Sequence, residues 1–438
     1  MWQGGADSGL LRGKPVVEMM NAIGFDAMAL GNHEFDWGLA TLKERAGEGR
    51  FPLLAANIYE KATGQRPDFV KPYIILERAG VKIGIIGLIT PDTPKTTNPQ
   101  AVAGFVFADP KSTLASLVPE VRRQGADVVV ALAHVESFID AAGRVTGGAA
   151  ALAAVPGVDA VVSGHSHQFV AGKAAGVPVV QAGFYGRATG RIILTYSKPD
   201  RKVLGSYVET VAVSAEGPAP DPAVQAIVEA AERAAAPIKS EVLGWAKAPL
   251  RHDKKEVSVL GQWVADAMRE AAKADIAFEN GGGIRASLPA GTLTMGMLYE
   301  ILPFDNELWT VELTGRQVLA VLEHGLSGSR YGAIQFSGLR VKYDPSRPAG
   351  QRVLEVVTAG GEPLDPGQTY LVATNDFLMG GGDEYAMFGE GRNPRNLGIQ
   401  LRDVLAEKVR KARIVDFGGD GRLALPAGAE QAPAKAAA

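Results

Sequence analysis

The chain has 438 residues, of which 46% are hydrophobic and 21% are charged, and its formal net charge is −3. These proportions are ordinary for a globular protein, and the length predicts two domains of roughly 200 residues each. The nearly balanced charge excludes a broad basic face for a nucleic acid polymer. The absence of cysteine excludes disulfides and thiolate metal ligands. No apolar run approaches the roughly 18 residues of a membrane-spanning helix, so no transmembrane segment is expected.

The beginning of the chain predicts a helix. Residues 1–13 contain neither a basic leader nor an apolar core, so the chain as given carries no signal peptide. Residues 14–24 follow with apolar side chains at helical spacing. Pro15 suits the first helical turn and Gly24 suits the stop.

Short apolar runs bounded by Gly, Asp or Pro predict strands throughout the first half of the chain. These runs occupy residues 26–30, 52–56, 81–89, 127–133, 159–162, 179–181 and 191–196. Helical patterns at residues 111–124 and 148–154 lie between some of them. The alternation predicts a layered α/β domain over residues 1–213.

The second half of the chain predicts a linker and another domain. Residues 214–237 begin with a Pro/Ala/Glu stretch and pass into an Ala/Glu helix, which predicts an interdomain linker and its helix. Residues 238–425 mix helices and strands and predict an α+β domain. Its expected helices are at 257–272 and 314–324, and its expected strands are at 275–279, 308–313, 338–343 and 370–374. Residues 426–438 have the composition of a disordered tail.

Four of the six histidines directly follow the C-terminal ends of predicted strands; they are His33, His134, His165 and His167. Ligands of α/β sheets gather at these strand ends. A single histidine there is more often a packing residue, but four of six favour a metal site. Nitrogen and oxygen ligands without thiolate suit Zn²⁺, Mn²⁺ or a similar divalent ion.

The segment Gly-Asn-His-Glu-Phe-Asp-Trp-Gly at residues 31–38 follows the strand at 26–30. Asn32 offers a neutral oxygen to a metal, and His33 can carry a proton. Asp36 stands three residues later, where a carboxylate can orient the imidazole and raise its basicity. A tight turn is the alternative for an isolated Asn-His pair, but the eight-residue context favours the functional interpretation.

The segment Gly-His-Ser-His at residues 164–167 follows the strand at 159–162. If this segment is extended, the spacing of His165 and His167 turns both imidazoles to one side. His134 ends another predicted strand and adds a third nitrogen. Taken alone, His134 is equally well explained as a buried histidine with satisfied hydrogen bonds.

These motifs stand in one order with Asn-Gly-Gly-Gly-Ile-Arg at residues 280–285 and Gly-Gly-Gly-Asp at 380–383. Together they resemble the 5′-nucleotidase family of calcineurin-like metallophosphoesterases, over residues 1 to about 425. The resemblance implies a layered αββα metallophosphoesterase domain followed by a mixed α+β nucleotide-binding domain. It also implies two divalent metal ions that activate a water for attack on phosphorus.

The resemblance assigns roles to the histidine motifs. It implies that Asn32, His134 and His165 bind one metal, that His167 binds the other, and that His33 with Asp36 forms a catalytic dyad. Two metals about 3.5 to 4 Å apart can generate hydroxide at neutral pH and stabilise the charge on the phosphoryl oxygens.

The resemblance also assigns a nucleoside site to the second domain. Arg285 resembles the family arginine that reaches the substrate, Phe377 the aromatic that stacks on the base, and Asp383 the carboxylate that meets polar groups of the nucleoside. Asn280 and Asn306 are weaker candidates for the same site.

The chain departs from the family pattern at its beginning. The family carries an Asp-x-His and a Gly-Asp before the position where this chain starts. Three ligands, including the carboxylate that bridges the metals, are therefore expected to be missing, and one metal site to be largely lost. A misplaced start codon or a fragment, without its first strands and its signal peptide, explains this departure.

A second departure concerns the base clamp, where Ala333 occupies the place of another aromatic residue. Tyr331 or Phe336 are the possible substitutes, and the preference for adenine is open. His252 and His324 match no motif and are expected to be surface or packing residues.

Three functional hypotheses follow. The first is hydrolysis of nucleoside 5′-monophosphates or related esters such as UDP-sugars and cyclic nucleotides, in bacterial nucleotide catabolism, by a protein that is periplasmic or secreted. The second is a nucleotide-binding protein with little or no turnover, because N-terminal metal ligands are absent. The third is a hydrolase of sulfur-compound conjugates, against which the intact segment at residues 31–38 argues. No protein partner is predicted.

Overall fold

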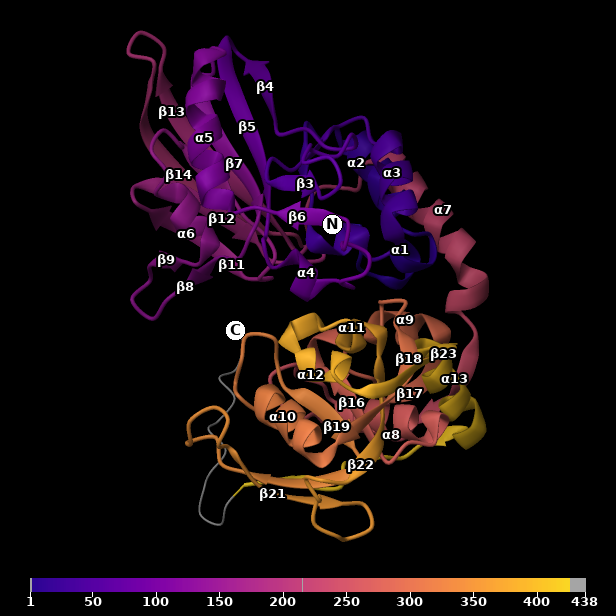
Figure 1. Cartoon of the computed structure of the whole chain (residues 1–438). Helices are drawn as coiled ribbons and strands as arrows, with labels where there is room; N and C mark the ends of the chain where they lie inside the picture. The colour runs from indigo at the N-terminus through magenta and orange to yellow at the C-terminus, as the bar shows by residue number, and fades with distance from the viewer. Residues whose placement is uncertain (1, 215, 426–438) are drawn as a thin grey trace. The chain divides into compact units, whose positions relative to one another are not determined.

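The computed structural model describes residues 2–214 and 216–425, so the predicted disordered tail at 426–438 lies outside the described residues. The chain divides into two compact units (Figure 1). The N-terminal unit comprises Met1–Gly4 and Leu11–Glu232, and the C-terminal unit comprises Gly5–Leu10 and Arg233–Ala438.

Two of these boundaries differ from the sequence-based ones. Residues 5–10, expected in the first domain, belong to the C-terminal unit. Their helix α1 (Ala6–Leu10) packs against α9 (Met295–Ile301), and the carboxylate of Asp7 lies 2.6 Å from the ammonium of Lys239. The division between the units falls inside helix α7 (Pro222–Lys239), the predicted linker helix, whose residues 233–239 are therefore part of the second unit.

A six-stranded sheet forms the centre of the N-terminal unit, in the order β11-β12-β10-β7-β5-β4. Its inner strands β5, β7, β10 and β12 are parallel, while β4 and β11 run antiparallel at the two edges. The strands span Tyr73–Arg78 (β4), Val81–Ile89 (β5), Val128–His134 (β7), Ala160–Val162 (β10), Phe169–Ala174 (β11) and Val177–Ala182 (β12). The four parallel strands match predicted runs and confirm the α/β class.

The register of the parallel strands brings their ends to one edge. Ile89 of β5 pairs with His134 of β7, and Leu132 of β7 pairs with Val162 of β10. Because these strands are parallel, the loops that follow them leave the sheet on the same side. This edge carries the histidine motifs.

One face of the sheet is covered by α5 (Pro110–Arg123) and α6 (Gly148–Ala153), as Figure 1 shows. The N-terminus of α5 is capped by Asp109, whose carboxylate accepts a hydrogen bond from the backbone N–H of Ser112 at 2.7 Å. Helix α5 turns a stripe of buried apolar residues to the sheet: Leu114, Leu117, Val118 and Val121.

The other face of the sheet is covered by the parallel pair β1 (Met28–Ala29) and β2 (Leu53–Leu54), which contacts β5 and β7. These strands are shorter than predicted. Helices α2 (Lys14–Ile23), η1 (Asn32–Phe35) and α3 (Gly38–Glu48) belong to this side and bury a second apolar core. The helix predicted at 14–24 is confirmed, and so is the layered αββα architecture.

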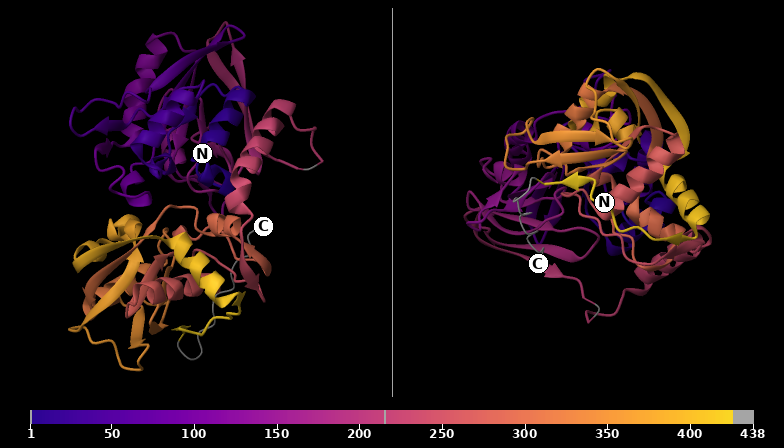
Figure 2. Two further views of the ribbon diagram at one scale, coloured as in Figure 1. Left: turned by 90° about the vertical axis from the view of Figure 1, so that its right-hand side faces the viewer. Right: turned by 90° about the horizontal axis from the view of Figure 1, so that it is seen from below.

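Shorter elements complete the N-terminal unit. They are β3 (Ile58–Glu60) paired with β6 (Phe105–Phe107), β8 (Phe138–Ile139) paired with β9 (Val145–Thr146), the helix α4 (Thr93–Thr96), and the hairpin β13 (Ala188–Ser197) with β14 (Lys202–Ala212). Each unit can be followed from two further sides in Figure 2.

The C-terminal unit contains a five-stranded sheet in the order β19-β16-β22-β18-β23. Strands β16 and β22 are parallel neighbours, and the other pairs are antiparallel. The strands span Ile276–Asn280 (β16), Glu307–Thr314 (β18), Ile334–Ser337 (β19), Thr369–Asn375 (β22) and Arg392–Gln400 (β23). The C-terminal ends of β16 and β22 therefore meet at one edge.

Two three-stranded sheets and several helices complete this unit. The first sheet contains β17 (Gly291–Thr294), β15 (Val242–Ala246) and β24 (Ile414–Val415). The second sheet contains β21 (Val353–Thr358), β20 (Leu339–Tyr343) and β25 (Leu423–Ala424). The helices are α8 (Val259–Ala272), η2 (Gly281–Gly283), α10 (Gly315–Gly325), α11 (Asp376–Met379), η3 (Gly382–Glu384), α12 (Ala386–Gly389) and α13 (Leu401–Ala412). The mixed α+β class predicted for this part is confirmed.

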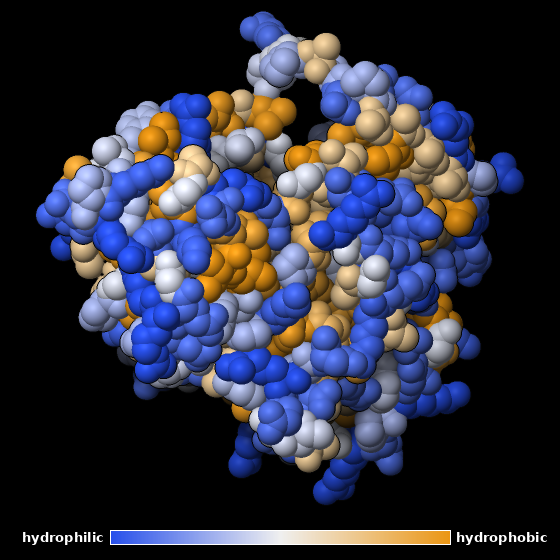
Figure 3. All heavy atoms as spheres, turned by 90° about the horizontal axis from the view of Figure 1, so that it is seen from above, coloured by the Kyte–Doolittle hydropathy of each residue, from blue (hydrophilic) through white to orange (hydrophobic). Residues whose placement is uncertain are grey.

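The face drawn in Figure 3 interleaves hydrophilic side chains with smaller apolar patches. Among the described residues, no helix combines the length and the apolar character needed to cross a bilayer.

Candidate functional site

Asn32 and His134 lie in contact at the edge of the central sheet. His134 is the last residue of β7, and Asn32 begins η1 after β1. The Nε2–H of His134 donates a hydrogen bond to Oδ1 of Asn32 at 2.9 Å. Two glycines permit the close packing of this imidazole: an added Cβ would lie 3.0 Å from its ring at Gly31 and 3.3 Å from it at Gly164.

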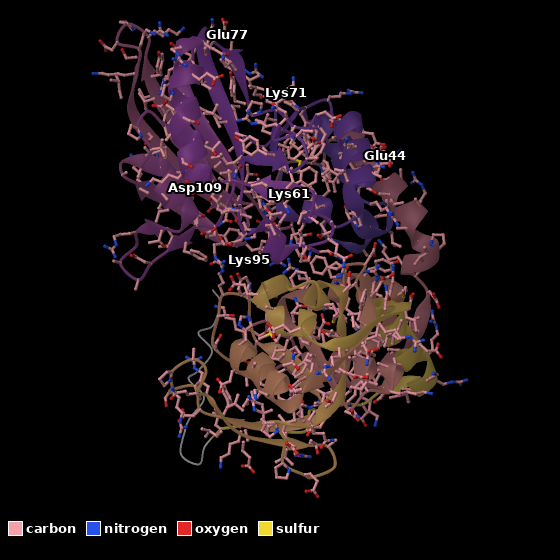
Figure 4. All side chains as sticks on the ribbon, in the orientation of Figure 1. Glu44, Lys61, Lys71, Glu77, Lys95 and Asp109 are labelled. Carbon is pink, nitrogen blue, oxygen red and sulfur yellow. The ribbon has the colours of Figure 1, made fainter. Side chains whose placement is uncertain are left out.

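The side chain of Asn32 is oriented by a loop that the sequence analysis did not select. Its amide nitrogen donates a hydrogen bond to the carbonyl of Thr96 at 2.8 Å, which turns Oδ1 toward His134. Thr96 ends α4, the helix that carries Lys95, labelled in Figure 4. A polar side chain as deeply buried as Asn32, which is 1% exposed, needs such partners.

The other two predicted metal ligands follow β10 in an unexpected conformation. The ring centroids of His134 and His165 lie 5.1 Å apart, so the structure brings these two imidazoles together. The segment is not extended, however, because φ is 70° at His165 and 58° at His167. The ring of His167 stacks on Phe184, with centroids 5.3 Å apart. The prediction of an extended segment is therefore wrong.

A buried amide holds this left-handed segment. The hydroxyl of Ser166 donates a hydrogen bond to the carbonyl of Ser137 at 2.8 Å. The side-chain amide of Gln181 donates to the hydroxyls of Ser166 and Ser137 at 2.8 and 2.9 Å. Gln181 is 1% exposed and Ser137 is fully buried. Left-handed angles are costly for residues other than glycine, so surrounding contacts must stabilise them.

His33 and Asp36 form the predicted pair. The Nδ1–H of His33 donates a hydrogen bond to Oδ2 of Asp36 at 2.9 Å. The other carboxylate oxygen accepts a hydrogen bond from the hydroxyl of Thr97 at 2.7 Å. This arrangement fixes the tautomer of His33, so Nε2 is the atom that can exchange a proton. The side chains of His33 and Asp36 are 26% and 10% exposed, which keeps the imidazole accessible.

The four histidines share one electrostatic neighbourhood. Burial lowers the pKa of His134 well below its ordinary value, and charge repulsion from His165, His33 and His167 lowers it further. This proximity agrees with a convergence of all four histidines at the sheet edge.

The donor atoms fit a divalent cation. Two ligand atoms that bind one cation at right angles, each through a bond of about 2.1 Å, lie about 3 Å apart. The distance between Nε2 of His134 and Oδ1 of Asn32 is 2.9 Å, which is close to this separation. Amide oxygen and imidazole nitrogen suit Zn²⁺ or Mn²⁺. Within residues 2–214 and 216–425, no group of three or more His, Asp or Glu side chains is arranged to hold a metal.

A second polar cluster lies in the C-terminal unit, at the ends of the parallel strands β16 and β22. Both strands end in asparagine. The amide nitrogen of Asn375 donates a hydrogen bond to Oδ1 of Asn280 at 3.0 Å, and that of Asn280 donates to Asp383 at 3.2 Å. The strand ends thus hold the carboxyl of Asp383, which is 7% exposed.

Burial raises the pKa of Asp383 to about 7, although Asn280, Lys254, Arg285 and Arg330 oppose this shift. Arg285 is therefore close enough to Asp383 to act on its charge. The sequence analysis did not select Lys254, whose pKa is lowered by burial and by Arg285.

The remaining predicted substrate residues lie on two short segments. Phe377 is on α11, and its ring packs so closely on Gly382 that an added Cβ would lie 2.5 Å from it. The guanidinium of Arg285 lies 5.4 Å from the ring centroid of Phe304. Asn306 instead donates a hydrogen bond to the carboxylate of Asp376 at 2.7 Å. Asn306 thus supports the start of α11.

One expectation for this unit needs correction, and the two histidines without a motif make structural contacts. Phe336 is fully buried in the core on β19 and is therefore not a base-clamp residue. His324 packs against Tyr385, with ring centroids 4.4 Å apart, and its Nε2–H donates a hydrogen bond to the carbonyl of Asp383 at 2.8 Å. The Nε2–H of His252 donates to the carbonyl of Gly281 at 3.0 Å. Both histidines hold loops of the polar cluster.

Comparison with known proteins agrees with this geometry. Residues 10–169 match the calcineurin-like phosphoesterase family, and residues 234–390 match the C-terminal domain family of 5′-nucleotidases. The structure of a 5′-nucleotidase precursor from Thermus thermophilus aligns with a TM-score of 0.86 and 30% identity, over 98% of this chain and 89% of that one.

Two further relatives show how widely this architecture is used. The sulfate thiohydrolase SoxB of Thermus thermophilus aligns with a TM-score of 0.78 and 26% identity, over 99% of this chain and 79% of SoxB. Endonuclease YhcR of Bacillus subtilis (strain 168) is 32% identical over 405 residues, which cover 88% of this chain and 33% of YhcR. The chain thus spans about a third of the length of YhcR. With both domain families in order, this chain belongs to the 5′-nucleotidase family of calcineurin-like metallophosphoesterases, a family of phosphoric ester hydrolases.

Proposed function

We propose that the chain hydrolyses nucleoside 5′-monophosphates or related phosphate esters, such as UDP-sugars and cyclic nucleotides. The observation that carries this proposal is the contact between Asn32 and His134, with His165 adjacent and the His33–Asp36 pair at the same edge of the sheet. The similarity to the Thermus thermophilus 5′-nucleotidase precursor supports it.

We propose a task for each of the six candidate side chains of the N-terminal unit. Asn32, His134, His165 and His167 would hold divalent cations, which supply activation of a water and neutralisation of phosphoryl charge when bound. His33 presents Nε2 to the transferring phosphoryl group, where an imidazolium stabilises developing negative charge. Asp36 holds the required tautomer of His33 and stabilises its protonated form.

The C-terminal unit is proposed to bind the nucleoside. Phe377 offers a ring on which a base can stack. Arg285 offers a planar guanidinium to phosphate or other substrate oxygens. Asp383 accepts hydrogen bonds from polar groups of the nucleoside, and Asn280 orients its carboxyl. Tyr331 is the remaining candidate for a second aromatic contact with the base.

The family resemblance also suggests where the protein works. We propose a bacterial protein of nucleotide catabolism that is periplasmic or secreted. The absence of cysteine is compatible with an exported protein.

A second candidate is a nucleotide-binding protein with little or no turnover. The described residues favour it in one respect, because no group of three or more His, Asp or Glu side chains is arranged to hold a metal. Turnover then separates the two candidates, since nucleotide binding is expected for both.

The decisive experiment measures phosphate release from AMP, UMP, UDP-glucose and a cyclic nucleotide, with Mn²⁺ or Zn²⁺ added to the purified chain. We expect turnover that His33→Ala lowers at least a hundredfold, because a general acid or charge stabiliser is lost. Lys61→Ala, at an exposed position labelled in Figure 4, is the control and should retain the parental rate.

Three other outcomes of this experiment would contradict the proposed function or the role of His33. Nucleotide binding without phosphate release under any metal would support the second candidate. Sulfate release from a cysteine S-sulfonate, without phosphate release from nucleotides, would favour chemistry like that named for SoxB. Equal rates for His33→Ala and the parent chain would contradict the assigned role of His33.

A further inference from the structure

Glu279 is a buried carboxyl to which neither the sequence motifs nor the proposed reaction assigns a role. It lies on β16, one residue before Asn280, and is 1% exposed. In the strand register it stands opposite Gln335 of β19. Acidic side chains are rarely buried this deeply without a partner of opposite charge or a specific function.

One oxygen of this carboxyl is held by the neighbouring parallel strand. The amide nitrogen of Asn375 donates a hydrogen bond to Oε2 of Glu279 at 2.9 Å. The same nitrogen donates to Asn280 at 3.0 Å, and the amide oxygen of Asn375 accepts from the backbone N–H of Leu378 at 2.7 Å. Asn375 is thus the cap that begins α11, the helix that carries Phe377.

The other oxygen lies under the glycine-rich turn η2. An added Cβ at Gly283 would lie 2.4 Å from Oε1 of Glu279, so the backbone of the turn rests directly on the carboxyl. Arg285 follows this turn two residues later. Any change in the volume, charge or direction of the Glu279 side chain therefore acts on the backbone that leads to Arg285.

The same network continues to the third candidate substrate residue. Asn280, which accepts a hydrogen bond from Asn375, donates another to Asp383 at 3.2 Å. One buried carboxyl thus lies at the junction of the segments that carry Arg285, Phe377 and Asp383. All three segments are held by contacts with Glu279, Asn375 or Asn280.

The charges around Glu279 favour its neutral form. Burial raises the pKa of Glu279 to about 8, the hydrogen bond from Asn375 opposes this shift, and the carboxylates of Asp376 and Asp383 add to it. Lys254, Arg285 and Arg330 instead act on Asp383. A neutral carboxyl can donate one hydrogen bond and accept others, as a glutamine side chain can.

We propose that Glu279 is a positioning residue of the nucleotide-binding site, whose buried carboxyl holds η2, Asn280 and Asn375 in the arrangement that presents Arg285, Phe377 and Asp383 to a nucleotide. The inference rests on the proposed function for the identity of the ligand. Ionisation of Glu279 places a charge beneath η2 and beside Asp376 and Asp383, and it loosens this arrangement.

The binding experiment uses the full chain with AMP and UMP as probes, in the presence of a chelator that prevents turnover. Affinity is measured by calorimetry from pH 6 to 9.5. We expect Glu279→Gln to bind within threefold of the parent chain at pH 7. By pH 9.5 the parent should lose at least tenfold in affinity relative to Glu279→Gln, because Glu279 is then largely ionised and the amide cannot ionise. Glu279→Leu should bind at least tenfold more weakly at every pH.

Glu355→Gln is the matched control, since Glu355 lies exposed on β21 of the same unit. It should reproduce the parental pH profile. A fall in affinity above pH 8 that is as large in Glu279→Gln as in the parent would overturn the proposal, and so would parental affinity in Glu279→Leu. The ratio of the two profiles removes the titration of the nucleotide, which both chains share.

Hydrogen exchange gives a readout that needs no nucleotide. After correction for intrinsic rates, amides of residues 281–285 and 376–379 should lose protection above pH 8 in the parent but keep it in Glu279→Gln. Equal protection in both chains would overturn the positioning role. A parent chain that binds no nucleotide at pH 7 would refute the proposed function, whereas the exchange difference tests Glu279 by itself.

Discussion

The imidazole of His134 and the amide oxygen of Asn32 lie 2.9 Å apart, although 102 residues separate them in the chain. The contact exists because β1 packs on the sheet that contains β7. Two candidate metal ligands from different layers of the unit therefore face one point, which a cation can occupy.

Removal of one of these donors should weaken metal binding. Asn32→Ala is expected to lower the affinity for Mn²⁺ at least tenfold, because the amide oxygen is lost and His134 loses its partner. In thermal denaturation, metal should stabilise the parent chain by about 2.7 kcal/mol at a concentration of 100 times Kd. At the same metal concentration, Asn32→Ala should be stabilised by about 1.4 kcal/mol or less. Gln65→Ala, which changes an exposed amide, should behave as the parent, and an unchanged metal response in Asn32→Ala would refute the assignment of Asn32 as a ligand.

Thr97 should matter for turnover without contacting the substrate. Its hydroxyl donates a hydrogen bond to Asp36, whose other oxygen holds His33. Thr97→Val removes a hydrogen bond to a charged group, worth about 1.5 to 3 kcal/mol, so kcat should fall by roughly ten- to a hundredfold if Asp36 loses its position. The pH profile of kcat should shift as well. Thr63→Val is the control, because the hydroxyl of Thr63 makes its hydrogen bonds at the surface, donating to the carboxylate of Glu60 and accepting from the backbone N–H of Gln65. A parental kcat and pH profile would show that Asp36 needs no such support.

Gln181 should be required for the conformation of the loop at residues 163–167. Gln181→Leu leaves the hydroxyls of Ser137 and Ser166 without their buried donor, which costs about 1 to 3 kcal/mol of stability. The left-handed angles of His165 and His167 should then relax. Metal affinity, measured by calorimetry on the folded variant, should fall more than tenfold. Gln65→Leu should change neither property, and a Gln181→Leu variant with parental metal affinity would contradict this role.

The buried carboxyl of Glu279 should make the stability of the C-terminal unit depend on pH. The unfolded chain releases this proton near an ordinary pKa of 4.5, while the folded chain holds it up to a pKa of about 8. The folded state therefore binds more protons between these values, and stability falls as pH rises through this window. Asp383, whose pKa is raised to about 7, adds a similar loss at lower pH.

Glu279→Gln should remove its share of this dependence. Relative to the parent chain, the free energy of unfolding of the variant should rise with pH by up to about 1.4 kcal/mol per unit between pH 5 and 8. Urea-dependent hydrogen exchange at β16 measures this quantity within the C-terminal unit. Glu355→Gln should show no such trend, and a difference between Glu279→Gln and the parent that stays constant with pH would contradict a raised pKa.

The sequence was informative wherever a local pattern sets the structure. Apolar runs bounded by turn residues located the strands β5, β7 and β16, because burial on both faces of a sheet requires them. Polar residues directly after such strands marked the histidine cluster, since the carboxyl ends of parallel strands meet at one edge. His134 and Asn32 could be selected in this way before their contact was known. The residues of the second cluster were predicted from the family resemblance.

Other features depended on which segments become neighbours. Thr97, Gln181 and Glu279 carry no motif, and each acts through partners that lie far away in the chain or on another element. The contact between α1 and α9 likewise assigns residues 5–10 to the C-terminal unit. Local composition cannot reveal such pairings, because a buried hydrogen bond is selected by the packing of distant elements.

The sequence by itself determined the layered class, the strand ends and the polar residues that follow them, because hydrophobic period and turn chemistry act over a few residues. The tertiary structure alone decided the left-handed angles of His165 and His167, the partners that hold them, and the burial of Glu279 beneath η2. These features arise only when separate elements exclude water between them, so that each buried polar group must find its partner across the fold.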